Sequence, residues 1–167
     1  MENRRRPRAA WVALLLAVLV LGVANAGWTL PPAQGFRCVL AMDGRQPLAE
    51  VFLRLSEDGT SLDYTLKVHG IENITMAHLH LGEAGKIGTP VVWLYPPSPP
   101  PKLIPGMFKG VLAEGTITEK DLIGGLRGRK LADLIDEMRD GNIHVNIHSR
   151  EHLRAGIFAG KIGRRRL

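Results

Sequence analysis

The sequence predicts a mainly β fold, an antiparallel sandwich or barrel with one or two short helices inserted before the last strands. Three observations predict it. Apolar and polar residues alternate over several short runs. Turn residues separate these runs, as Glu57-Asp58-Gly59 does between the second and third. Helical spacing is confined to the stretch that precedes the last two runs.

The predicted strands are short and follow one another along the whole domain. Residues 50–55 and 62–68 alternate in period two on either side of the Asp58-Gly59 turn, which predicts a β-hairpin. Residues 74–81 form a further run that ends at Gly82. The other strand candidates are residues 36–41, 91–94, 108–117, 143–148 and 156–162.

The helical part is predicted from capping residues and spacing. Thr118 followed by Asp121 has the form of a capping box, which opens a short helix. Apolar residues then recur at spacings of three, four and seven over residues 131–138, which predicts an amphipathic helix ended by Gly141. The proline-rich residues 96–101 cannot join a strand ladder, so we expect an extended loop at the rim of the fold.

Composition excludes several classes of protein. The 167 residues are 45% hydrophobic and 23% charged, which is too apolar for a disordered chain and too short for several domains. A single cysteine, Cys38, excludes a disulfide scaffold and a cysteine-based zinc ribbon. Only 5% of residues are aromatic and no basic stripe accompanies the net charge of +6, so no nucleic-acid partner is expected.

The N-terminus has the features of an export signal. Basic residues 2–8 precede the uncharged residues 11–23, and Ala24-Asn25-Ala26 provides small residues where a signal peptidase reads them. We therefore expect residues 1–26 to be a secretory signal peptide; an uncleaved anchor is the alternative. Either way we expect the domain to lie outside the cytoplasm, secreted or in the cell envelope, and to touch the membrane only through an uncleaved N-terminal segment.

These features divide the chain into four parts. The signal carries four Arg and one Glu, so a mature chain without it has a formal charge of +3. The expected parts are a signal peptide or anchor over residues 1–26, a linker over 27–35, one β domain over 36–162 and a basic tail over 163–167.

The candidate site residues of the sequence are histidines. Side chains repeat every two residues on one face of a strand, so His78 and His80 point the same way, and so do His144 and His148. If the two strands are neighbours, or face each other across the fold, up to four imidazoles converge. The six histidines of the chain are His69, His78, His80, His144, His148 and His152.

Three or four converging imidazoles would make a metal site. Imidazole nitrogen binds zinc or copper at about 2.0–2.1 Å. A set without thiolate or carboxylate favours copper(II), zinc or nickel over calcium. Two other interpretations stay open: histidines that are structural and hydrogen-bonded to the backbone, and a proton sensor, since clustered imidazoles titrate near neutrality.

The order of these motifs resembles the CHRD domain family, the module named from chordin. The family pattern has AHIHxG in the middle, then a YVNVHT-like strand and a GEIRG-like close. The matching segments here are residues 62–68 with Gly70-Ile71, residues 77–82 with Gly85 and Gly88, Gly141, residues 145–149 and residues 156–160. The resemblance covers about residues 36–162. It implies an antiparallel Greek-key β-sandwich of the immunoglobulin-like or copper-zinc superoxide dismutase-like kind.

Carried over residue by residue, the family's histidines fall on His78, His80 and His148. His144 stands where the family usually has tyrosine, so it adds an imidazole to the face that holds His148. The Glu and Arg of the closing motif are replaced by Ile157 and Ala159, so no charged pair is expected there.

Three functions are compatible with the sequence. The first is an exported, non-catalytic CHRD-domain protein with a copper or zinc site made by His78, His80 and His148, with His144 as a possible fourth ligand. The second is a cell-envelope interaction or adhesion module with structural histidines, whose proline-rich loop and helix bind an unknown extracellular protein. The third is a superoxide dismutase-like metalloenzyme with an open coordination position. No nucleotide-binding, serine-hydrolase or zinc-protease motif is present.

Overall fold

The architecture is taken from a computed structural model, which describes residues 35–40, 48–82, 88–154 and 156–164. The expected signal peptide, nearly all of the expected linker and the last three residues of the tail lie outside the described residues, as does the turn at residues 83–86. Within the part that is described, no helix combines the length and the hydropathy needed to cross a membrane.

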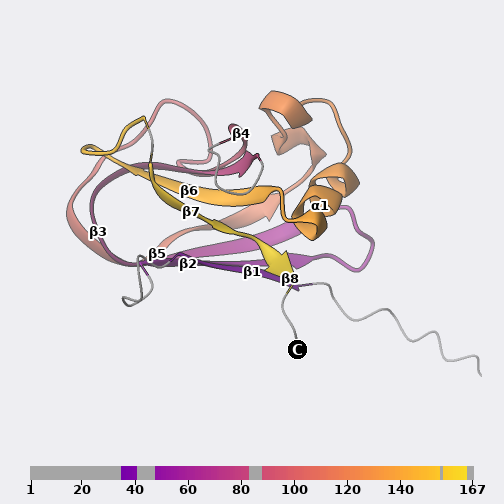
Figure 1. Cartoon of the computed structure of the whole chain (residues 1–167), viewed down its shortest axis with the longest axis horizontal. Helices are drawn as coiled ribbons and strands as arrows, with labels where there is room; N and C mark the ends of the chain where they lie inside the picture. The colour runs from indigo at the N-terminus through magenta and orange to yellow at the C-terminus, as the bar shows by residue number, and fades with distance from the viewer. Residues whose placement is uncertain (1–34, 41–47, 83–87, 155, 165–167) are drawn as a thin grey trace, which may run out of the picture.

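Eight strands, one α-helix and two 3-10 turns make up the described chain (Figure 1). The strands are β1 (Gly35–Leu40), β2 (Ala49–Leu55), β3 (Leu62–Leu81), β4 (Thr89–Tyr95), β5 (Ile104–Ile117), β6 (Ile143–Ser149), β7 (Ile157–Lys161) and β8 (Gly163–Arg164). Between β5 and β6 lie the 3-10 turns η1 (Glu119–Asp121) and η2 (Gly124–Leu126) and the helix α1 (Leu131–Asp140). The mainly β fold with helices before the last strands is confirmed.

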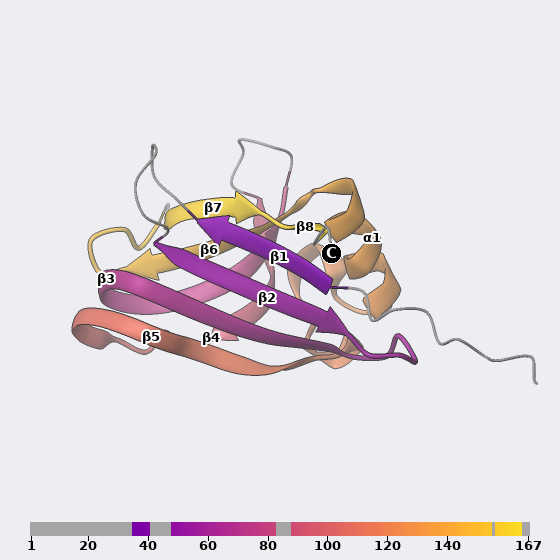
Figure 2. The ribbon, with the colours of Figure 1, turned by 90° about the horizontal axis from the view of Figure 1, so that it is seen from below.

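All strand pairs are antiparallel and form one curled sheet. The strand order is β7-β6-β3-β2-β1-β8, with β4 and β5 as further partners of β3. Only Ile162 separates β7 from β8, so the order begins and ends on the same C-terminal segment and the sheet closes on itself. Figures 1 and 2 show two facing layers, β4 and β6 in one and β1, β2 and β5 in the other, which is consistent with a β-sandwich.

Strand β3 joins the two layers and differs from the expectation of two separate strands. Its first half pairs with β2 and β5, and its second half pairs with β6 and β4. At the bend, Gly70 has a φ of 110° and Asn73 a φ of 51°, and the ladder to β5 shifts register around both residues. Such bulges turn a strand without ending its pairing, so the chain continues where the period-two pattern breaks.

The predicted hairpin is confirmed in register. Leu55 pairs with Leu62 at its closed end and Ala49 with Val68 at its open end. In the turn, the Asp58 carboxylate accepts hydrogen bonds from the Ser56 hydroxyl at 2.7 Å and from the Thr60 N–H at 3.0 Å. These bonds lower the pKa of Asp58, the Ser56 hydroxyl contributing most.

The predicted helix is α1, and it packs on the core. Its four large apolar residues are all buried: Leu131, Leu134, Ile135 and Met138. Gly141 ends the helix in the left-handed conformation, with a φ of 75°, where glycine is favoured. The predicted capping box is also present, since the Thr118 N–H donates to the Asp121 carboxylate at 2.8 Å, but the helix that it opens is only the 3-10 turn η1.

Candidate metal centre

The two histidine clusters lie side by side because β3 and β6 are antiparallel neighbours. In this ladder Met76 is opposite His148, and His80 is opposite His144. Residues directly opposite each other project from the same face of a sheet. The alternate residues of both strands, among them Leu79 and Val145, project into the hydrophobic core. All four histidines therefore lie on the face that points away from the core.

The histidine face is nonetheless buried. His78, His80 and His148 are 4%, 6% and 4% exposed. Two segments provide backbone contacts to the rings: residue Gly88, just before β4, and Leu153 in the turn after β6. Buried polar side chains are normally satisfied by hydrogen bonds or by a bound ion.

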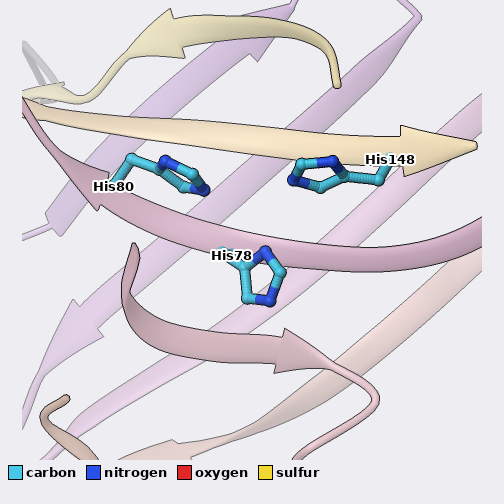
Figure 3. Close-up of side chains that lie close together, drawn as sticks. All are labelled: His78, His80 and His148. Atoms are coloured by element: carbon cyan, nitrogen blue, oxygen red, sulfur yellow. The ribbon is translucent and has the colours of Figure 1, made fainter. Parts of the chain in front are cut away.

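Three of the four imidazoles converge. The ring centroid of His78 lies 5.7 Å from that of His80 and 5.4 Å from that of His148. The centroids of His80 and His148 are 6.1 Å apart. One ring nitrogen of each residue lies within 4.8 Å of those of the other two. Figure 3 shows the His80 and His148 rings facing each other, with His78 beside them toward β4. Tetrahedral zinc ligands stand about 3.3 Å apart, so the rings need to close by at most about 1.5 Å around an ion.

Hydrogen bonds fix the tautomer of two rings. Nδ1 of His80 lies 2.8 Å from the Gly88 carbonyl oxygen, and Nδ1 of His148 lies 2.9 Å from the Leu153 carbonyl oxygen. A carbonyl only accepts, so each Nδ1 carries the proton and each Nε2 keeps a lone pair. Among the described residues neither Nε2 has a hydrogen-bond partner. This pattern, an anchored Nδ1 and a bare Nε2, is typical of metal-ligating histidine.

His78 is held differently from the other two rings. Neither of its ring nitrogens has a hydrogen-bond partner in the part of the chain that is described. Instead, the Trp93 ring packs edge-on against it, with centroids 4.1 Å apart. From the sequence Trp93 is only one residue of an apolar strand, and nothing in the local pattern assigns it to the histidines. The β3–β4 ladder, which pairs the two residues, makes this contact.

Burial keeps the three imidazoles neutral. Desolvation, followed by the neighbouring His148 and His80, lowers the pKa of His78 from 6.5 to about 3. Desolvation also lowers the pKa values of His80 and His148, against an opposing effect of the Gly88 and Leu153 carbonyls. The neutral ring is the form that binds a metal ion, so these residues are ready ligands at neutral pH.

The remaining histidines occupy different places. His144 is buried and directly opposite His80, but it is not one of the three residues whose nitrogens group together. His69 is half-buried on the first half of β3, outside the group. His152 is exposed in the turn after β6.

Gly156 lies beside the histidines, although the sequence alone did not assign it to the site. Gly156 has a φ of 72°, and a Cβ at this position would run into the side chain of Asn146. Asn146 is opposite His78 in the β3–β6 ladder. Gly156 therefore lets the segment after β6 return close over the histidine face.

The metal-free protein is expected to lose stability as the pH falls below about 6.5. The three folded-state pKa values are lowered, so the unfolded chain binds more protons in this range. Above pH 6.5 the three rings are neutral in both the folded and the unfolded chain, and the full free energy of unfolding is present. As the pH falls from 6.5 toward the folded-state pKa, about 3 for His78, protons bind the unfolded chain preferentially and the free energy of unfolding decreases. Urea unfolding at a series of pH values measures it. His78→Gln should flatten the dependence, and an unchanged pH dependence in this variant would contradict the assignment.

Comparison with known proteins identifies the family. The family model for the CHRD domain matches residues 43–157, which is more than half of the chain. Neither the curated proteins nor the solved structures include a match. The matched region contains the three converging histidines and the strands that carry them. The chain therefore belongs to the CHRD domain family.

Proposed function

We propose that this protein is an exported, non-catalytic CHRD-domain protein that binds one copper or zinc ion through His78, His80 and His148. One observation carries the proposal: two imidazoles are anchored through Nδ1 so that their bare, buried Nε2 atoms face a third ring. Buried nitrogen lone pairs that converge can be satisfied together by one bound cation, and because burial opposes protonation of the same rings, that cation is a metal ion and not a proton.

The ligand chemistry supports a transition metal. The group contains only histidines among the described residues, with no Asp, Glu or Cys as a further member. Calcium and magnesium require oxygen ligands, whereas imidazole suits copper, zinc and nickel. Cys38 is buried in the hydrophobic core and is not a member of the group, so it adds no thiolate to this set. His144 stays a candidate for a fourth ligand because it shares the face and is opposite His80.

The packing of α1 supports this function over the adhesion module. The adhesion hypothesis needs an exposed apolar surface on the helix, but all four large apolar residues of α1 are buried in the core. The proline-rich connection between β4 and β5 is exposed over residues 97–101, and no apolar side of the helix adds to it. Export is proposed from the basic, apolar and small-residue order of residues 1–26.

Metal uptake tests the proposal directly. Titration calorimetry of the purified protein with copper(II) and with zinc should show one ion bound per chain at micromolar metal, and elemental analysis after gel filtration should show the same ratio. The absence of uptake of both ions would refute the proposed function. A superoxide dismutation assay on the loaded protein separates storage from the dismutase-like alternative.

Trp93 provides an optical test of where the ion binds. Copper(II) is expected to quench the fluorescence of Trp93, because this ring packs on His78 at 4.1 Å. Zinc has a filled d shell and should not quench it. Trp93→Phe, which keeps an aromatic edge against His78, should retain uptake but lose most of the quenching. Equal quenching in this variant would place the copper elsewhere.

A further inference from the structure

Met76 lies at the edge of the histidine group. It is directly opposite His148 in the β3–β6 ladder and two residues before His78 on the same face of β3. Directly opposite residues have Cβ atoms about 4.5–5.5 Å apart, and the methionine side chain has three rotatable bonds. The thioether of Met76 is therefore within reach of an ion held by the three imidazoles. Met76 is half-buried, and its place opposite His148 puts it on the side of the group where His78 and His148 lie.

The donors around this position are all neutral. An imidazole binds a metal ion in its neutral form and a thioether carries no charge, and no carboxylate or thiolate joins the three histidines among the described residues. The cost of moving an ion from water into a buried site rises with the square of its charge. A divalent ion here finds no anionic side chain and has to take an anion such as hydroxide from solvent to offset that cost, whereas a monovalent ion incurs a much smaller cost.

Both observations select the same ion. Copper is the first-row metal that is stable as a monovalent ion in proteins, and thioether sulfur is a soft donor that selects Cu(I). We infer that the site holds copper as Cu(I), with the Met76 thioether as the fourth ligand beside His78, His80 and His148; this inference rests on the proposed function. His144 is then a neighbour of the site on the same face and not its fourth donor.

The experiment compares two ions on two methionine variants. Met76→Leu keeps the volume and apolar character of the side chain but removes the sulfur. Met107→Leu is the matched control, because Met107 lies on β5 and is 64% exposed. Cu(I) affinity is measured anaerobically by competition with bicinchoninate, and zinc affinity by competition with a chromophoric chelator, on wild type and both variants.

The wild type should bind Cu(I) more tightly than zinc. Met76→Leu should lower the Cu(I) affinity by at least about tenfold, the effect typical of weakening a metal site, and change the zinc affinity by less than about threefold. Met107→Leu should change neither.

Two results would overturn the inference. One is an unchanged Cu(I) affinity in Met76→Leu, or an equal loss of Cu(I) and zinc affinity. Either outcome would show that Met76 is not a ligand, while the three-histidine site would still be supported. Failure of the wild type to bind either ion would overturn the proposed function and this inference together.

Discussion

Replacing His80 with alanine is expected to abolish stoichiometric metal binding. His80 contributes one of three converging nitrogens, and its ring is already oriented by the Gly88 carbonyl. Loss of a partner that only orients a ligand costs about 10–100-fold in metal affinity, so loss of the ligand itself should cost more than about 100-fold. Titration calorimetry with the ion that the wild type binds measures the change.

The matched control is another histidine of the same strand. His69→Ala removes an imidazole from β3 outside the group, so it should leave the affinity and the one-to-one ratio unchanged. An equal loss in both variants would mean that the effect is not specific to the group. Full binding by His80→Ala would show that the three histidines do not form the site.

Replacing Leu79 with alanine should lower the stability of the fold, whereas replacing His80 lowers metal affinity. Leu79 lies between His78 and His80 but projects into the core, where it is 0% exposed. Truncating a fully buried leucine leaves a cavity and costs about 2–5 kcal/mol of unfolding free energy. Urea unfolding of the metal-free protein measures this loss.

The comparison with His80→Ala tests the assignment of the two faces. In the metal-free protein His80→Ala loses the hydrogen bond from Nδ1 to the half-buried Gly88 carbonyl, about 0.5–1.5 kcal/mol, and removes an Nε2 that has no hydrogen-bond partner among the described residues. Its stability cost should therefore be below that of Leu79→Ala. Comparable losses of stability in the two variants would show that the histidine face is part of the structural core. The pair therefore separates ligands from packing residues on one strand.

Several features could be predicted from the sequence because they depend on neighbouring residues. The hairpin between β2 and β3 follows from period-two alternation around Asp58-Gly59. The helix α1 follows from apolar spacing and from Gly141, whose φ of 75° few other residues adopt.

Other features could not be predicted, because the local pattern is ambiguous there. The continuity of β3 through Gly70 and Asn73 depends on bulges in its pairing with β5, and a glycine at this place is equally compatible with a turn. The start of β5 at Ile104, before the predicted residue 108, depends on the same long partner strand.

The sequence by itself determined that His78 and His80 share one face of a strand and that His144 and His148 share one face of another, because side chains alternate along any extended chain. Only the tertiary structure decided that these strands are neighbours, with Met76 opposite His148 and His80 opposite His144. It also decided that the Gly88 and Leu153 carbonyls orient two of the rings and that Trp93 packs on the third. The physical reason is that pairing between segments distant in sequence is selected by burial of the whole sheet, which no local pattern encodes.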